Sequence, residues 1–587
     1  MLHFLHDLLH PLNLLWRERN DLFWPIWIAT TALAAVVVIW VVPKKKSIPR
    51  DSLPSLRHNW SRGAILAVTF LAVLLACYIA GSLVWEDFTY YDNSHFTNGT
   101  LVGKDIPRQI LPANGRFFPL GHQEYNLIRH VTSSVTGYHA LRIVQLVLLC
   151  GILLVFDEDL SIWARVALIV LVLITPSVLI SFSGLIYPEW NVVFWLICLA
   201  WFVKRFEQTQ SRAWAVAAVI SSQFMLYYKE TAFLLLLGFA FGRLVLRAWN
   251  AHQGGWDFKR LRDSENRLDM CLGFLGLLFF VYYLAAMFPN YSFGYADESQ
   301  LPLKQALVSY VKLDLLVWVL AAVVLGRILQ ILRRKATPAL LWDGLALGGV
   351  GCLAGYLILR MNAGYFLAPA DIIAVLYLGH LAVLSVKNMS RAQRLSAVSL
   401  LILVVFQDFS LSAFRMYERK NVIHAKAEMA QSIKMRYESD PQNLKRLFFP
   451  FAQPFHIMEF ASYLNYIGVP VEQVPASSLA DGGIVIVGKV FKADGPCGYR
   501  PFMCHPGSRP NPGDLVVVLP EDFTRTDELN SYQQEDEPLF SYQPHPNIPR
   551  WLFPYVNAQR VVSPIFSQSQ LPESWLNASV TVWKSSQ

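Results

Sequence analysis

The stretch GAILAVTFLAVLLACYIAGSLVWED, residues 63–87, sets the fold class of this chain. Its first part, 63–84, is an uninterrupted apolar run that stops abruptly at Trp85-Glu86-Asp87. A helix needs about 20 apolar residues to cross a bilayer, so this run predicts a membrane span. Two adjacent acids at the end of a span are costly unless they are solvated, paired or used by the protein. We therefore expect a functional loop to begin at Glu86.

The loop that follows, residues 85–137, is long and rich in chemically active side chains. It contains YYDNSHF at 90–96 and GRFFPLGHQEY at 115–125, and the next apolar run opens near Tyr138. These segments contribute imidazole, guanidinium and carboxylate groups from His95, Arg116, His122 and Glu124. Such groups bind anions, carry protons and accept or donate hydrogen bonds. We predict that this loop forms the reaction side of a membrane enzyme.

The composition of the whole chain agrees with a membrane class. Of the 587 residues, 54% are hydrophobic and only 16% are charged, and the mean hydropathy is +0.36. The apolar residues come in blocks long enough to cross a bilayer, which predicts a polytopic α-helical membrane protein. We expect about twelve spans, at 22–42, 63–84, 138–156, 164–183, 187–203, 213–228, 231–248, 270–288, 306–326, 338–359, 365–386 and 395–413.

The positive charge of the chain follows membrane topology, and we expect no nucleic-acid partner. The net charge is +8, and the Lys and Arg residues gather in one set of alternate short loops, from 43–62 to 387–394. The opposite short loops contain few basic residues beyond Lys229, Lys304 and Arg360. The positive-inside rule makes the basic loops cytoplasmic. The 85–137 loop and everything after residue 413 then face the outside, and an even number of spans also places the N-terminus there.

The remaining segments lie before and after the spans. Residues 1–21 predict an amphipathic helix in the membrane interface. The transmembrane domain then covers 22–413, and a polar connecting helix follows at 414–440. Residues 441–587 contain strand-like runs separated by many prolines and glycines. This pattern predicts a compact extracytoplasmic α/β domain at the C-terminus.

The predicted C-terminal domain contains two cysteines but no catalytic motif. Five of the seven cysteines lie in predicted spans, where a thiol behaves as a small hydrophobe. The other two, Cys497 and Cys504, lie close together in a polar region, and outside the cytoplasm they would form a disulfide. Two free thiols are the alternative. For His456, Glu459 and His505 we favour a structural interpretation.

The short outer hairpins carry an unusual set of charged and tyrosine side chains. The main members of this set are Tyr187, Glu189, Lys229, Glu230 and Arg360. Each has a structural alternative, because Lys229 and Arg360 can extend to the interface from span ends and Glu189 can begin a helix. Together with the acidic pair after the second span, however, they lie at one membrane face. That common placement favours a functional site.

This layout resembles the GT-C class of membrane glycosyltransferases. The similarity rests on Glu86-Asp87 after an early span, with GRFFPLGHQEY and the YYKE hairpin as further support. The class includes lipid A aminoarabinose transferases, protein O-mannosyltransferases and arabinofuranosyltransferases, and a C-terminal soluble domain is part of its plan. Its members usually have an odd number of spans before that domain. The extra N-terminal span at 22–42 is therefore a departure from the pattern.

The resemblance implies a reaction and a role for each residue. Such enzymes transfer a sugar from a polyprenyl phosphate to an acceptor hydroxyl, with inversion of the anomeric carbon. Asp87 would be the base, with Glu86 as the alternative or as an acceptor-positioning group. The developing phosphate charge needs cations, for which the candidates are Lys229, Arg360 and Arg116. The expected contacts to sugar or acceptor hydroxyls are Glu230, Glu189, Tyr187, His122 and Glu124.

The resemblance also implies partners and a location. The partners are a polyprenyl-phosphate sugar, membrane lipids, and a glycan, lipid or protein acceptor. We expect no cofactor, although Asp87, His95, His122 and Glu124 are ligand types without a recognisable metal-site spacing, so a divalent metal stays an alternative. The expected location is the bacterial inner membrane, with the active site and the C-terminal domain facing the periplasm.

Three other functions compete with this interpretation. An O-antigen polymerase or ligase also acts on lipid-linked glycans, but it resembles a plan with large late loops and no folded C-terminal domain. A transporter or flippase of lipid-linked glycans predicts charged or broken spans at mid-membrane depth. Pro176, Asp371 and Asp408 lie in or near spans, but they do not form paired halves. An assembly scaffold would leave the charged outer hairpins unexplained.

Overall fold

A computed structural model of the chain describes most of its residues. These are 20–42, 62–80, 88, 94–111, 116–250, 255–256, 266–287, 302–359, 364–385, 389–449, 454–475, 483–489, 513–519, 538–542 and 580–584. Most of the predicted interfacial helix lies outside these ranges, as do Glu86, Asp87, Arg360, Cys497 and Cys504. The roles of these residues and the disulfide therefore stay predictions.

The chain is mostly helical, and every predicted span falls on a helix or a pair of helices. The principal elements are α2 (Phe23–Val41), α3 (Arg62–Ala80), α6 (Val135–Phe156), α7 (Ile162–Ile174), α8 (Pro176–Ser183), α9 (Glu189–Thr209), α10 (Arg212–Tyr228), α11 (Ala232–Ala248), α12 (Arg267–Met287), α14 (Leu303–Leu313), α15 (Leu316–Leu332), α16 (Leu340–Leu359), η8 (Gly364–Leu367), α17 (Ala368–Ser385) and α18 (Arg391–Ser439). Among the described residues, seven helices are long and apolar enough to cross a membrane, or eight if the bent pair α7–α8 is one span. The protein is thus a polytopic helical protein, and the number of twelve spans stays a prediction.

Two of the predicted spans are broken. Helices α7 and α8 meet at Thr175-Pro176 with a bend of 68°. Proline has no backbone N–H and disfavours helical geometry at the residue before it, which accounts for the break. Between α14 and α15 the backbone at Asp314 is extended, and its Oδ1 accepts the N–H groups of Leu316 at 2.8 Å and Val317 at 3.3 Å. Asp314 therefore caps the first turn of α15.

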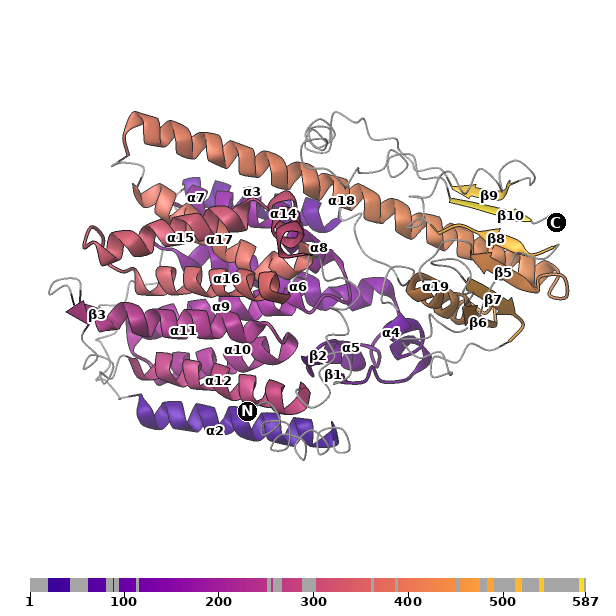
Figure 1. Ribbon diagram of the computed structural model, residues 1–587, viewed down its shortest axis with the longest axis horizontal. Coiled ribbons are helices and arrows are strands. Elements are labelled where there is room, and N and C mark those ends of the chain that lie inside the picture. Colours follow the sequence, from indigo (N-terminus) through magenta and orange to yellow (C-terminus); the bar gives the residue numbers. More distant parts are fainter. Residues whose placement is uncertain are drawn as a thin grey trace.

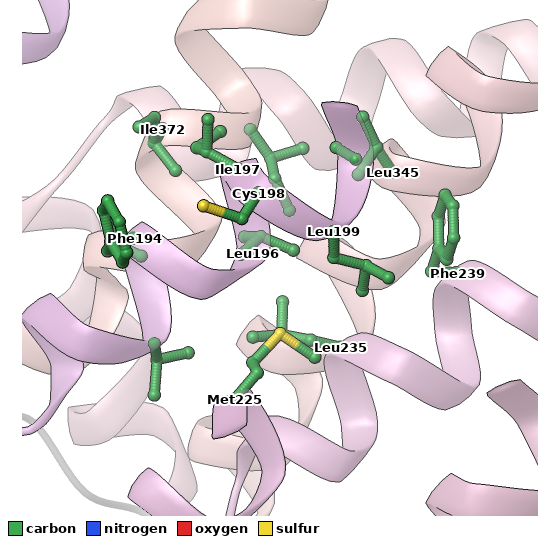
Figure 2. Packing of buried hydrophobic residues seen from close by; sticks show 14 of the residues in the cluster. Phe194, Leu196, Ile197, Cys198, Leu199, Met225, Leu235, Phe239, Leu345 and Ile372 are labelled. Atoms are coloured by element: carbon green, nitrogen blue, oxygen red, sulfur yellow. The ribbon is translucent and has the colours of Figure 1, made fainter. Parts of the chain in front are cut away.

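Helix α9 lies at the centre of the bundle. Its side chains Leu196, Ile197 and Leu199 are almost fully buried. Figure 2 shows them among side chains of four other helices, namely Met225 of α10, Leu235 and Phe239 of α11, Leu345 of α16 and Ile372 of α17. A helix that is apolar all round is enclosed by its neighbours. This packing fixes the position of Glu189, the first residue of α9.

Helices α11 and α16 approach each other through glycines. A Cβ atom added at Gly238 would lie 2.8 Å from the Cα atom of Gly348, and one added at Gly348 would lie 2.8 Å from the carbonyl oxygen of Leu235. Both distances are too short for a side chain, so the close approach requires these small residues. The contact holds α11, which begins directly after the Lys229-Glu230 hairpin.

The first long loop folds into small elements at one end of the bundle. These are α4 (Ser94–Thr97), η3 (Thr100–Val102), β1 (Gln109–Leu111), β2 (Arg116–Phe118) and α5 (Gln123–Ile128). Strands β1 and β2 pair antiparallel, with Gln109 opposite Phe118. The loop has a small aromatic core in which the ring of Phe96 lies 5.0 Å from that of Tyr125 and 5.5 Å from that of Tyr138.

The C-terminal part of the chain contains a sheet and one helix. The elements are β5 (Arg446–Phe449), α19 (Pro454–Tyr466), β6 (Val471–Pro475), β7 (Gly483–Val487), β8 (Leu515–Val517), β9 (Pro538–Tyr542) and β10 (Val580–Lys584). The six strands form one sheet in the order β6-β7-β5-β8-β10-β9, in which only the β5–β8 pair is parallel. Their apolar cluster includes side chains of α19 and the last turns of α18, such as Met429 and Ile433.

Helix α18 joins the two parts of the molecule. Its 49 residues contain both the last predicted span and most of the predicted connecting segment. Figure 1 shows α18 running the length of the bundle to the C-terminal sheet. The elements of the first loop lie at that same end, whereas β3 (Trp249–Asn250), from the loop between α11 and α12, lies at the opposite end. This arrangement agrees with the predicted alternation of loops, and the compartment that each end faces stays a prediction.

Candidate functional site

Two buried ion pairs form the centre of the candidate site. Lys229 Nζ lies 2.8 Å from Glu189 Oε1, and both side chains are almost fully buried. Arg116 Nε lies 2.9 Å from Glu230 Oε1, and these side chains are also mostly buried. The four residues come from β2, the start of α9 and the hairpin between α10 and α11. Because a buried charge without a partner is strongly destabilising, the two pairs hold these three segments together.

Aromatic rings enclose the two cations. The guanidinium carbon of Arg116 lies 4.7 Å from the centre of the Phe118 ring, and Lys229 Nζ lies 5.5 Å from the same ring. Lys229 Nζ also lies 5.0 Å from the centre of the Phe366 ring in η8. The rings attract the cations through their negative faces and exclude water from them. A phosphate that binds here would compete with the two glutamates for these cations.

Two histidines from the first loop lie beside this centre. His122 precedes α5 in a left-handed backbone conformation, with φ of 66°, and its ring stacks on that of His95 at 5.8 Å. Burial lowers the pKa of both imidazoles. The pKa of His122 falls well below its usual range because further positive charge comes from His95, Arg142, Lys229 and Arg116. Both histidines are therefore neutral at physiological pH.

Glu124 links the first loop to the spans. Asn191 Nδ2 of α9 donates to Glu124 Oε1 at 2.9 Å, and Gln145 Nε2 of α6 donates to Asn191 Oδ1 at 2.8 Å. Burial raises the pKa of Glu124, and it outweighs the lowering effects of the backbone hydrogen bond, Arg142 and Asn191. The carboxyl group therefore holds a proton more readily than a solvated glutamate does.

Arg142 of α6 organises the loop that leads into α9. The residue is only 2% exposed, and its Nη1 donates to the carbonyl oxygen of Ser181 at 2.8 Å. Its Nη2 donates to the carbonyl oxygens of Leu185 at 2.7 Å and Tyr187 at 3.3 Å. The hydroxyl of Tyr125 also donates to the Leu185 carbonyl oxygen, at 2.7 Å. These bonds satisfy carbonyl groups of a buried loop and fix its path.

Tyr187 connects this loop to α18. Its hydroxyl accepts a hydrogen bond from Arg419 Nη2 at 2.8 Å, and the Arg419 guanidinium lies 5.2 Å from the centre of its ring. Arg419 Nη1 also donates to Ser183 Oγ at 3.3 Å. On its other side the Tyr187 ring packs 4.4 Å from that of Tyr365. The predicted contact of Tyr187 with a sugar hydroxyl would therefore have to add to its contact with α18.

The two glutamates of the ion pairs each keep an oxygen without a hydrogen-bond partner in the part of the chain that the structure describes. Among the described residues, none donates to Glu189 Oε2 or to Glu230 Oε2. The two residues are 0% and 9% exposed. A buried acceptor left unsatisfied costs about 1–3 kcal/mol, so the arrangement suits a ligand that donates hydrogen bonds. Hydroxyl groups are donors of this kind.

The structure brings most of the described predicted site residues to one place. These are Arg116, His122, Glu124, Glu189, Lys229 and Glu230, with Tyr187 alongside. Sequence reasoning missed four residues that support them, namely Gln145, Arg142, Asn191 and Phe366. Of these four residues, only Arg142 could have been found from the sequence, because an arginine inside an apolar run usually has a function.

A second buried polar cluster lies where the broken helices meet. Asp314 and Asp371 share a side-chain hydrogen bond, and Asp408 of α18 acts on them electrostatically. Ser177, at the start of α8, donates a hydrogen bond to Asp371 Oδ2. The three acids belong to three different predicted spans, so the fold alone brings them together.

Neither a metal centre nor a relative identifies the site. In the part of the chain that the structure describes, no group of three or more His, Cys, Asp or Glu residues has the geometry to hold a metal ion. Comparisons with family models, with curated proteins and with solved structures gave no match to this chain. The function must therefore be argued from the chemistry of the site.

Proposed function

We propose that this chain is a membrane glycosyltransferase of the GT-C class. It would move a sugar from a polyprenyl phosphate to an extracytoplasmic glycan, lipid or protein. The observation that carries the proposal is the pairing of two buried cations with carboxylates whose second oxygens have no hydrogen-bond donor among the described residues. Cations stabilise the charge that develops on a departing phosphate. The free carboxylate oxygens accept hydrogen bonds from sugar hydroxyls.

In the proposed reaction the acceptor hydroxyl oxygen attacks the anomeric carbon of the donor sugar. The bond between that carbon and the phosphate oxygen breaks, and its electron pair leaves with the polyprenyl phosphate. Asp87 takes the hydroxyl proton, with Glu86 as the alternative base, and a positioned base contributes about 10²–10⁴ in rate. Lys229 and Arg116, with Arg360, stabilise the phosphate. Attack from the side opposite the phosphate inverts the anomeric carbon.

The proposal includes twelve spans, an extracytoplasmic C-terminal α/β domain and a periplasmic site in a bacterial inner membrane. Support for the spans is that each of the twelve predicted segments falls, where the structure describes it, on one helix or on a pair of helices. Support for the sidedness is that the first loop and the C-terminal sheet lie at the same end of the bundle. The positive-inside distribution of Lys and Arg predicts that this end is extracytoplasmic.

The test compares a knockout strain with the same strain complemented either by the wild-type protein or by Asp87→Asn. The two proteins are produced at matched levels. The intact masses of envelope lipids, glycans and glycoproteins are recorded, together with those of polyprenyl-phosphate sugars. We expect Asp87→Asn to lose one sugar from one product and to accumulate the corresponding lipid-linked sugar. If the variant matches wild type while the knockout differs, Asp87 is not the base. If a whole lipid-linked glycan accumulates instead, the chain is an O-antigen polymerase or ligase.

One observation favours a second candidate function, the transport of a lipid-linked glycan. Asp314, Asp371 and Asp408 are buried together at two broken helices, and proton-coupled transporters carry acids in such places. Reconstitution into liposomes that hold a fluorescent lipid-linked glycan separates the two functions. Movement of the glycan across the bilayer without a change in its mass supports transport, provided that Asp371→Asn abolishes it. A change in mass without movement supports the transferase.

A further inference from the structure

Helix α19 of the C-terminal part contacts helix α4 of the first loop at two matched points. Glu459 Oε2 accepts the backbone N–H of Ser94 at 2.5 Å, and Glu459 Oε1 accepts the Ser94 hydroxyl at 2.7 Å. The hydroxyls of Thr97 and Ser462 share a further hydrogen bond at 2.5 Å. In each helix the two residues are three positions apart and so lie on one face. The two contacts together fix the register of α4 against α19.

Helix α4 also carries a residue of the candidate site. His95 directly follows Ser94 and stacks on His122, and Phe96 is fully buried among the rings of the first loop. Glu459 is itself only 5% exposed, and Ser462 is 0% exposed. The short helix is thus held on one side by α19 and on the other side by the loop core. Any shift of α19 would move the His95 ring relative to His122.

We infer that the C-terminal part positions the neutral imidazole of His95 in the candidate site and that Glu459 is the positioning residue. The inference rests on the proposed function and gives the C-terminal part a role in it. Glu459 does not touch the reacting atoms in this account. It acts through α4, because its carboxylate accepts both donors of Ser94 and so restrains that residue at two points.

The variants Glu459→Gln and Glu459→Ala separate the effect of the charge from the effect of the hydrogen bonds to Ser94. Glu459→Gln removes the charge but keeps an acceptor for the Ser94 N–H and a donor for its hydroxyl oxygen. Glu459→Ala removes both bonds. The titratable groups that face α4 include His122 before α5, Tyr125 of α5, Tyr138 of α6 and Glu459 of α19, and both variants remove the same charge, that of Glu459. Glu472→Ala is the matched control, because the Glu472 carboxylate lies on the surface, 3.8 Å from Lys489.

The first measurement does not depend on the proposed function. Diethyl pyrocarbonate modifies neutral, accessible imidazoles, and mass spectrometry of the full chain in lipid nanodiscs gives the modification rate of His95. We expect Glu459→Ala to raise that rate about tenfold, because two hydrogen bonds to a charged group are lost. Glu459→Gln and Glu472→Ala should stay close to wild type. An unchanged rate in Glu459→Ala would overturn the inference even if sugar transfer is confirmed.

The second measurement is the pH profile of sugar transfer. Burial lowers the pKa of His95, so wild type keeps this imidazole neutral at a pH where a solvated histidine is charged. Exposure in Glu459→Ala raises the pKa, so the acid limb of kcat should move to higher pH while the KM for the donor is unchanged. A purely structural role would lower the amount of folded protein without moving that limb. If wild type transfers no sugar, the proposed function is wrong. The modification rate of His95 then tests on its own whether Glu459 positions α4.

A rescue experiment covers the case in which Glu459→Ala folds poorly. Thr97 and Ser462 are replaced by cysteines in the Glu459→Ala background, because their hydroxyls lie close enough for a disulfide to replace their hydrogen bond. Oxidation should return the modification rate of His95 and the acid limb of kcat to wild-type values, and reduction should reverse both. If the disulfide forms and neither value recovers, α19 does not position His95.

Discussion

Two buried ion-pair clusters lie at opposite ends of helix α9 and are built differently. Helix α9 begins at Glu189, in the candidate site, and carries Glu207 about 27 Å further along. At that far end Arg243 contacts Glu207 at 2.5 Å and Asp269 at 2.8 Å. Arg247 contacts the same two carboxylates at 3.3 Å and 3.6 Å. Each charge of the far cluster therefore faces two opposite charges, whereas each cation of the site pairs with one glutamate.

This difference indicates a structural role for the far cluster and a ligand-binding role for the site cluster. The far cluster stands on three helices, α9, α11 and α12, and both oxygens of Asp269 face an arginine. The site cluster stands on a strand, a hairpin and the start of one helix, and two of its carboxylate oxygens have no donor among the described residues. Asp269 Oδ2 also lacks a hydrogen-bond donor among the described residues, but it lies 3.6 Å from Arg247 Nη2, so the far cluster differs from the site cluster in sharing its cations between two carboxylates. We interpret the far cluster as structural and the near one as functional.

The largest effect is expected at Lys229. Lys229→Met leaves Glu189 buried without a cation, which should lower the free energy of unfolding by about 3–5 kcal/mol. It also removes a cation from the proposed phosphate position, which should lower kcat about 10²–10³-fold in the folded protein. The measurements are thermal unfolding in nanodiscs and sugar transfer per folded molecule. If only the stability changes, the site cluster has a structural role, as the far cluster does.

A charge reversal sharpens this test. The double variant Lys229→Glu with Glu189→Lys restores an ion pair of the opposite order at the same place. We expect its unfolding midpoint to recover most of the loss, because the pair is again complementary. Its activity should stay low, because the cation no longer lies between the rings of Phe118 and Phe366. Recovery of full activity would contradict a specific role for Lys229.

A smaller and purely structural effect is expected at Arg243. Arg243→Met leaves Glu207 and Asp269 with Arg247 as their shared cation, so the free energy of unfolding should fall by only about 1.5–3 kcal/mol. Sugar transfer per folded molecule should equal that of wild type, because the residue lies at the other end of α9. A loss of kcat in the folded fraction would show that the two clusters are coupled.

The two clusters also show how much of the site was predictable. Lys229 and Glu189 were predicted because they interrupt a pattern, as charges at the ends of apolar runs on one face. Which cation pairs with which acid was not predictable, because the partners lie in separate hairpins and only the packing of α9, α10 and α11 sets their distances. The bond from Glu459 to Ser94 joins residues 365 positions apart, and no local pattern predicts it. The helical positions of the predicted spans were easier to predict, because their apolar runs are long and continuous.

The smallest effect is expected at the second ion pair of the site, Arg116 with Glu230, and it concerns the pH dependence of stability. Burial raises the pKa of Glu230, but Arg116 and Lys229 outweigh burial and hold the pKa below its usual range. A carboxylate with a lowered pKa stabilises the fold above the unfolded-state pKa of about 4.3, and this contribution is lost as the pH falls through the folded-state value. In Arg116→Gln the pKa of Glu230 should rise. The difference in the free energy of unfolding between wild type and this variant should then be larger at pH 7 than at an acid pH where Glu230 is protonated in both.

Arg129→Gln supplies the matched control for this pH dependence. Arg129 pairs with Asp105 at 2.8 Å in the same loop, but the Asp105 side chain is 64% exposed. An exposed pair contributes only about 0–1 kcal/mol, so this variant should follow the wild-type curve from pH 3 to 7. Because both variants remove one arginine from the first loop, net charge cannot explain a difference between them. An offset in Arg116→Gln that stays constant over this range would mean that Glu230 does not depend on Arg116. The Arg116–Glu230 pair would then make no electrostatic contribution to stability. That result would contradict the proposed difference between the site cluster and the far cluster.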